Sequence, residues 1–225
     1  MTVKTQACKL FEAMCDNIDG STTFAAIFCC NAINKVYGKS ITEESLWDME
    51  NDPFLANTPV EFVVDACLLA ITVISYILPE RKDLTAIFTR SMDINIDELL
   101  ERKPIPASEN ALIVAKAVIL RSRMSLLIGY YGDMLYVNNF EAFKKSTSFL
   151  FESIGMSQGA EKVVALQCVD TLKTIVVDSD IAKRFLTFLP EIVLMITKLM
   201  ESVNFPQFFE FVLEFVKFYC RVLNE

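Results

Sequence analysis

Carboxylates cluster between residues 42 and 54, in the string TEESLWDMENDPF. Clustered carboxylates attract lysine and arginine and can hold a basic peptide through charge-assisted hydrogen bonds. The same string is also typical of a solvated loop that caps a helix, with its tryptophan packed on neighbours, and the sequence favours this plainer interpretation. If the segment does bind a partner, the contacts are expected from Glu43, Glu44, Trp47, Asp48, Glu50 and Asp52.

Two basic residues, Arg121 and Arg123, are the second candidate contact. They stand two positions apart, so on a helix they project from different faces. Arg121 could reach an acidic partner or pair with a carboxylate of a neighbouring helix pair, and the ion pair within the fold is favoured. If that pair is exposed, it adds little stability.

Catalytic residues are harder to find, because the chain has no histidine. Histidine is the commonest general base and a frequent metal ligand, and serine nucleophiles usually need it. No GxxxxGK[ST] or GxGxxG string occurs. We therefore predict no catalytic, cofactor or metal site, and an all-helical enzyme remains an alternative that any measured turnover would revive.

The seven cysteines form no CxxC pair and lie mostly inside apolar runs. They are interpreted as reduced, buried thiols, which indicates a cytoplasmic or nuclear location. A net charge of −8 argues against nucleic acid as the direct partner and favours basic proteins. The most apolar run, Phe62–Leu78, is short for a membrane span and contains Asp65, so we expect a core helix and no membrane insertion.

The elements that would position these residues are all predicted to be helices. Apolar residues recur at helical spacing throughout, no strand is indicated, and glycine and proline are scarce, at 6 and 7 residues. Ser21 or Thr22 is expected to cap the second helix, and Gly129 and Gly132 indicate close packing within a helix. The predicted helices are Lys4–Cys15, Thr23–Tyr37, a short one from Thr42 to Pro53, Pro59–Leu78, Asp83–Ser91, 111–119 and 120–136 (separate or continuous), Phe140–Ile154, Ser157–Val177, Ile181–Val203 and Phe208–Leu223.

The spacing of the helices indicates a repeat. Strongly apolar second helices begin near residues 23, 60, 120, 162 and 207, and several intervals are about forty residues, the period of HEAT or armadillo units. The long step from 60 to 120 holds an irregular insertion near 92–107, with Pro104 and Pro106. The predicted fold is therefore all-α: one right-handed α-solenoid segment over 1–225, built from about five antiparallel HEAT-like helix pairs. The last helix is apolar on almost every side, so we expect the stack to continue beyond Glu225 in a longer chain.

Several strings resemble the importin-β superfamily of nuclear transport receptors, most of all the importin seven, nine and eleven group. Thr42–Phe54 resembles the acidic "T-x-E-x-L-x-x-W-x-x-D-P-E" string of that family, although its tryptophan lies closer to the leucine and Phe54 replaces the last glutamate. LRSRMSLLIGYYGDML (120–135) is similar to the "R-R-R-x-x-W-L-I-G-x-W" helix. EKVVALQCVDTL (161–172) resembles the second helix of a HEAT unit, and FLPE (188–191) resembles the start of the next one. The likeness runs from Thr42 to the end of the chain and corresponds to the middle of such a receptor.

This resemblance implies a shuttling protein of cytoplasm and nucleus that carries basic cargo proteins and binds Phe-Gly nucleoporins. Contacts with the GTPase Ran would lie in other parts of the chain. The Phe-rich segments 140–151 and 205–218 could offer grooves to Phe-Gly peptides, but aromatic stripes at helical spacing mostly belong to a core. The alternative is a HEAT scaffold of another complex: a phosphatase scaffold, a coat subunit or an assembly factor.

Overall fold

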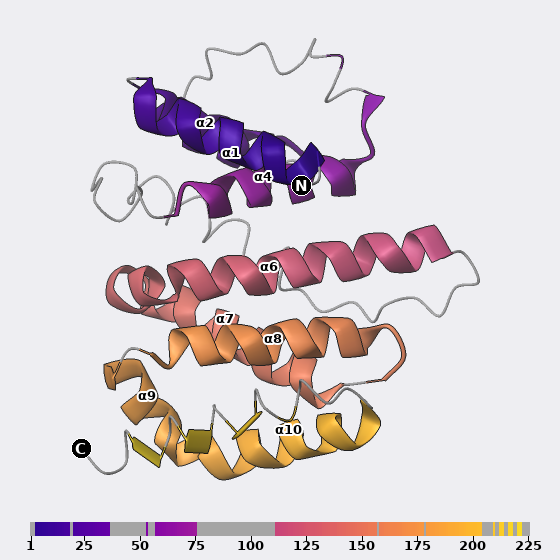
Figure 1. Cartoon of the computed structure of the whole chain (residues 1–225), viewed down its shortest axis with the longest axis vertical. Coiled ribbons are helices and arrows are strands. Elements are labelled where there is room, and N and C mark those ends of the chain that lie inside the picture. Colours follow the sequence, from indigo (N-terminus) through magenta and orange to yellow (C-terminus); the bar gives the residue numbers. More distant parts are fainter. Residues whose placement is uncertain are drawn as a thin grey trace. The chain divides into compact units, whose positions relative to one another are not determined.

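A computed structural model describes residues 3–18, 20–36, 53, 57–75, 111–156, 158–177 and 179–203, and the isolated positions 209, 212–213, 216–217 and 220–221. These residues are about 90% helical and contain no strand, so the predicted all-α class is confirmed (Figure 1). The chain divides into two compact units, residues 1–102 and 103–225, which are described separately below.

In the first unit, helices α1 (Val3–Asn17), α2 (Ser21–Val36) and α4 (Val60–Val73) contact one another. The core lies mainly between α2 and α4. From α4, the side chains of Val64, Leu68 and Ile71 are almost fully buried, and they recur at the spacing that places them on one face of a helix. Because α2 contributes mainly alanine and cysteine to this contact, the two helices meet through side chains of very different size.

The sequence predicts that Ser21 or Thr22 caps α2, but both side chains make other hydrogen bonds. The Ser21 hydroxyl donates to the carbonyl oxygens of Met14 (2.9 Å) and Ile18 (2.7 Å), and the Thr22 hydroxyl donates to Cys15 (3.1 Å). An N-cap would accept from an amide instead, so the predicted cap is wrong. The carbonyl oxygens of Met14 and Ile18 also accept backbone amides, from Ile18 and Ser21, so the Ser21 hydroxyl adds a second bond to each across the tight turn at Gly20, whose φ is +77°.

The apolar helix α4 begins after Pro59, as the sequence predicts, because proline needs no helical partner for a missing amide. Its turn structure continues to residue 75, and the predicted end at Leu78 lies outside the described residues. Among the residues that the structure describes, no helix is both long enough and apolar enough to cross a membrane.

The second unit begins with α6 (Ala111–Asn138), which shows that the segments 111–119 and 120–136 form one continuous helix. Asn139 ends it and caps α7 (Phe140–Gly155), because its side-chain oxygen accepts from the Ala142 amide at 3.1 Å. The chain then forms α8 (Glu161–Ile175), the short α9 (Ser179–Phe185), the 3-10 turn η2 (Leu186–Phe188) and α10 (Leu189–Ser202).

Helices α6 and α8 lie side by side and run in the same direction (Figure 1). Arg121 in the first half of α6 meets Glu161 at the start of α8, whereas Gly132 further along α6 meets Ile175 at the end of α8. Helix α7 returns in the opposite direction and contacts both. Unit 2 is therefore organised by contacts between alternate helices as well as between consecutive ones.

The last helices of the unit repeat this alternation. Helix α10 runs opposite to α8, because the Lys162 ammonium at the start of α8 donates to the Ser202 carbonyl at the end of α10 over 2.7 Å. Helix α10 also packs against α7, where Met195 lies beside Gly155. The elements α6 and α8 form one set of neighbours, and α7 and α10 form the other.

The prediction of one helix over Ile181–Val203 is wrong, because η2 interrupts it. Pro190 has no amide hydrogen, and its ring would clash with the carbonyl of the residue four positions earlier, Leu186, in a continuous helix. The chain instead tightens into a 3-10 turn, and Pro190 becomes the second residue of α10. Apolar residues recur at helical spacing on both sides of this break, so the periodicity of the sequence does not indicate it.

Several predicted features fall outside the described residues: the short helix from Thr42 to Pro53, the helix Asp83–Ser91 and the insertion near 92–107. In the predicted last helix, 208–223, every described position is helical. The structure gives no further test of these elements.

Two glycines of α6, Gly129 and Gly132, face α8, and they differ in how closely α8 approaches them. A Cβ atom at Gly132 would lie 3.0 Å from the Ile175 Cγ1 atom, closer than side chains normally approach. At Gly129, a Cβ would lie 3.5 Å from the Thr171 methyl group, which is ordinary contact. Gly132 is thus the point of closest approach, in agreement with the close packing expected from these glycines.

We predict opposite effects for alanine at these two glycines. Gly129→Ala should raise the free energy of unfolding by about 0.5 kcal/mol, because alanine favours the helix. Gly132→Ala should lower it by roughly 1 kcal/mol, because overpacking against the buried Ile175 outweighs that gain. Urea unfolding followed by circular dichroism measures both; equal changes for the two variants would show that the helices do not cross here.

Candidate functional site

Of the predicted contact residues, only the two arginines lie in described parts of the structure. Glu43, Glu44, Trp47, Asp48, Glu50 and Asp52 all lie outside them. Arg121 and Arg123 are both half-buried on α6. The structure therefore describes one of the two predicted binding regions.

Arg121 forms an ion pair with Glu161, between the Nη1 and Oε1 atoms, at 2.8 Å. The two side chains are only 11% and 16% exposed, so solvent screens the pair less than it screens a surface pair. The partner belongs to α8, which is the next helix but one. Arg121 therefore joins two helices, which is the alternative that the sequence favoured over contact with an external acidic protein.

One turn further along α6, two hydroxyls form a buried polar contact with α8. The Ser125 hydroxyl donates to Thr171 Oγ1, and the Thr171 hydroxyl donates to the carbonyl oxygen of Ser125, both at 2.9 Å. Ser125 is fully buried and Thr171 is 2% exposed. Because the two donors and acceptors are matched, burial of these groups carries little desolvation cost.

Aromatic rings and cations gather where α6, α7 and α9 meet. Tyr136 packs edge-on against Phe140 and Phe143, with ring centroids 5.8 and 5.2 Å apart. The guanidinium of Arg184 lies 5.3 Å from the ring centroids of both Tyr136 and Phe140, and the Lys144 ammonium lies 5.0 Å from that of Phe140. Each contact between a cation and the face of a ring contributes about 0.5–1 kcal/mol at an exposed site.

The sequence allows two interpretations of the Phe-rich segment 140–151, a core stripe or a surface groove. The structure answers this question separately for each phenylalanine. Phe143 and Phe149 are buried, and Phe143 and Phe151 pack on Phe185. Only Phe140, at 38%, is substantially exposed. The segment thus belongs mainly to the core and presents one ring, flanked by two cations, to the surface.

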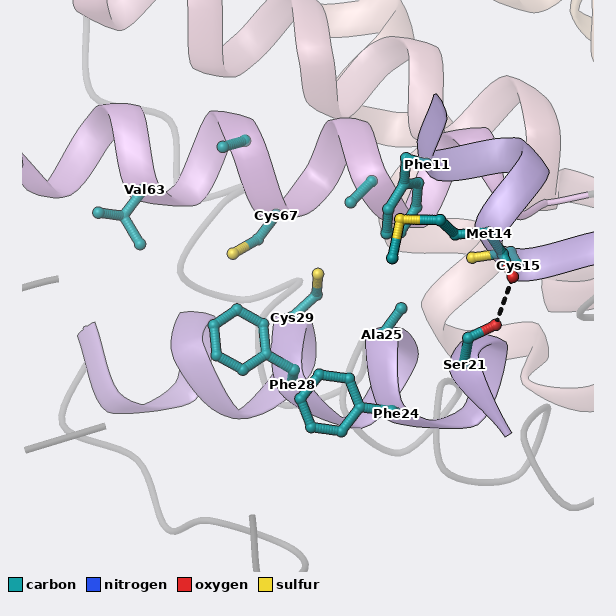
Figure 2. Close-up of a pocket in the computed structure, with 12 residues that line it drawn as sticks. Phe11, Met14, Cys15, Ser21, Phe24, Ala25, Phe28, Cys29, Val63 and Cys67 are labelled. Atoms are coloured by element: carbon teal, nitrogen blue, oxygen red, sulfur yellow. Dashed lines mark hydrogen bonds between the residues drawn. The ribbon is translucent and has the colours of Figure 1, made fainter. Parts of the chain in front are cut away.

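The first unit holds a feature that sequence reasoning missed, an apolar pocket of about 290 Å³ (Figure 2). All three helices contribute to it, and none of its lining residues carries a charge. The pocket is lined by Phe11, Met14 and Cys15 of α1, Ser21, Phe24, Ala25, Phe28 and Cys29 of α2, and Val63, Ala66, Cys67 and Ala70 of α4.

Two thiols of this pocket, those of Cys29 and Cys67, point toward one another from α2 and α4 (Figure 2). The hydrogen bond to Cys67 and burial together raise the pKa of the Cys29 thiol well above its usual value. Burial also raises the pKa of Cys15, although the hydroxyls of Thr22 and Ser21 oppose this effect. The thiols of Cys29 and Cys15 are therefore neutral at physiological pH and act as soft apolar groups.

The burial predicted for the cysteines is found for Cys15, Cys29, Cys30, Cys67 and Cys168, whereas Cys8 is half-buried and Cys220 is exposed. Within the described parts of the chain, no three cysteine, aspartate or glutamate side chains are grouped as a metal site would require. Helical spacing places Phe24 and Phe28 on one face of α2, and it likewise places Val63, Ala66 and Ala70 on one face of α4. This spacing could have indicated the two lining faces. It does not indicate that three helices leave a space between such faces.

No protein family, no curated protein and no solved structure matches this chain.

The ion pair between α6 and α8 gives a second prediction, for which the chain offers a matched control. Glu161→Gln should lower the free energy of unfolding by about 1–2 kcal/mol, because it leaves the half-buried Arg121 without its counter-charge. Glu141, also in the first turn of its helix, pairs with Lys144 at 2.6 Å, but those side chains are 74% and 53% exposed. Glu141→Gln should cost less than about 0.5 kcal/mol.

Denaturant unfolding of the two variants at low and at high salt makes the comparison. The cost of Glu161→Gln should persist in salt, whereas the smaller cost of Glu141→Gln should vanish. If the two substitutions behave alike, Arg121 and Glu161 do not form a shielded pair in solution.

Proposed function

We propose that this chain is a segment of a HEAT-type helical scaffold that works by binding other proteins. The observation that carries the proposal is the alternation of neighbours in the second unit. Helices α6 and α8 run side by side in one direction, while α7 and α10 form the second set and run in the other. Stacked helix pairs produce this pattern, because the first helices of successive pairs adjoin one another, as do the second helices.

The contacts between α6 and α8 support the same proposal, since they join successive pairs. The Arg121–Glu161 ion pair and the Ser125–Thr171 hydrogen bonds link residues 40 and 46 positions apart in the chain. Such separations match the repeat period of about forty residues that the sequence indicates. A stack held by neighbour contacts can change its curvature slightly at each step, which suits a surface that adapts to partners.

We propose further that the scaffold is the middle segment of an importin-β-like transport receptor that shuttles between cytoplasm and nucleus. The family strings support this proposal. Two of them fall at structurally distinctive positions: Gly129, of the "I-G" pair, lies at the α6–α8 crossing, and Leu189-Pro190 begins α10. The expected partners are basic cargo proteins and Phe-Gly nucleoporins, with Ran contacted by other parts of the chain. A HEAT scaffold of another complex, such as a phosphatase scaffold, a coat subunit or an assembly factor, is the alternative.

The acidic segment supplies the sharpest test. We expect the chain to bind an immobilised lysine-rich peptide at low ionic strength and more weakly at physiological ionic strength, because charges drive the contact. The triple variant Glu43→Gln, Glu44→Gln and Asp48→Asn should weaken this binding by about tenfold or more, since three carboxylates are lost together. Biolayer interferometry on both forms measures the change.

The matched control changes the net charge by the same amount in the second unit, through Glu141→Gln, Glu152→Gln and Glu191→Gln. These three side chains are exposed, so the fold should tolerate the changes. Equal loss in the two triple variants would indicate only a general charge effect and would contradict a site at 43–52. Binding to neither the lysine-rich peptide nor a Phe-Gly peptide would contradict the transport-receptor proposal and leave the other scaffolds.

A further inference from the structure

The pocket between α1, α2 and α4 has a size and a lining that define what it can hold. Its volume of about 290 Å³ is roughly twice the ~150 Å³ of an engineered apolar cavity that stays dry and binds benzene. It lies just below the usual range of small-molecule sites, roughly 300–1,000 Å³. A ligand that fits is therefore small, of the order of one substituted aromatic ring or a short hydrocarbon chain.

The chemistry of the lining excludes charged ligands. Its side chains are aromatic rings, methyl groups, a thioether, thiols and a single hydroxyl. That hydroxyl, on Ser21, already donates to the carbonyls of Met14 and Ile18. Among the described residues of the lining, no side chain carries a charge that could balance a carboxylate or an ammonium group, and an unbalanced ion loses its hydration on entry.

The aromatic and sulfur groups of the lining favour a ring over an aliphatic chain. Phe24 and Phe28 stack along α2 with their ring centroids 6.0 Å apart, and Phe11 contributes a third ring from α1 (Figure 2). Met14 and the thiols of Cys29 and Cys67 add polarizable sulfur, which interacts well with aromatic edges. Phe24 and Met14 remain 41% and 45% exposed at the rim, so binding would also cover apolar surface that now faces water.

We propose that this pocket is a binding site for an uncharged, apolar small molecule with a single aromatic ring. The proposal concerns the first unit alone and does not depend on the scaffold function proposed above. Because Cys29 and Cys67 lie in the wall of the pocket, a bound ligand would cover their sulfur atoms. The chain therefore carries its own reporters of occupancy.

The test uses toluene, benzoate and benzylamine, which share one ring and differ in charge. With the whole chain, saturating toluene should slow the reaction of Cys29 and Cys67 with a small neutral maleimide at least fivefold. Mass mapping of peptides reads each cysteine separately. Cys220, which is exposed in the second unit, should react at an unchanged rate and serves as the internal control. Benzoate and benzylamine at the same concentration should give no protection.

Two variants fill the pocket, Ala25→Leu and Ala70→Leu, and Ala115→Leu places the same change on an exposed position of α6. The first two should abolish the upward shift of the melting temperature that toluene causes, and the third should retain it. Far-UV circular dichroism checks that each variant is folded, and the labelling of the unsubstituted chain needs no variant. Three results would each overturn the proposal. The first is equal protection by all three compounds, and the second is absence of protection by toluene. The third is a toluene-induced shift of the melting temperature that is undiminished in both folded pocket variants.

Discussion

The close approach of α6 and α8 is the contact on which the second unit depends. Two helices can approach to this degree only where a side chain is small, and Gly132 provides that gap opposite Ile175. A closer crossing brings more atoms within van der Waals distance, and each added contact contributes little alone but much in sum. Helix α7 then packs against a pair whose geometry is already set.

Polar contacts fix the register of this crossing, which apolar packing alone would leave open to slippage. The Ser125 and Thr171 hydroxyls satisfy each other only when these two residues are opposite, and a shift by one turn would bury both without partners. The Arg121–Glu161 pair adds a second point, at the start of α8. Two points on two helices define both their separation and their direction. The Arg121 side chain, which the sequence makes a candidate for partner binding, thus also serves the internal arrangement.

Sequence periodicity predicts which segments are helical better than it predicts where they end. The sequence predicts the helix over 140–154 almost to the residue, because the Asn139 side chain caps its start and the helix ends at Gly155, one residue beyond the prediction. The sequence does not predict the break at 186–188 in the same way, because apolar residues recur at helical spacing on both sides of it. The function of Ser21 was likewise misjudged. Its type suits a helix start, but its position after a three-residue turn brings it within reach of the carbonyls that end α1.

The sequence does not predict the pocket, because the pocket depends on where the side chains of three helices leave space between them. Small residues have opposite consequences in the two units. At the α6–α8 crossing, Gly132 lets the helices close until Ile175 fills the space. Between α2 and α4, Ala25, Ala66 and Ala70 line the pocket together with bulkier residues such as Phe28 and Val63, and the space beside the alanines is not filled. Small residues occur at both places, so their presence in the sequence does not distinguish a tight contact from a cavity. The size of the side chains opposite them makes the difference.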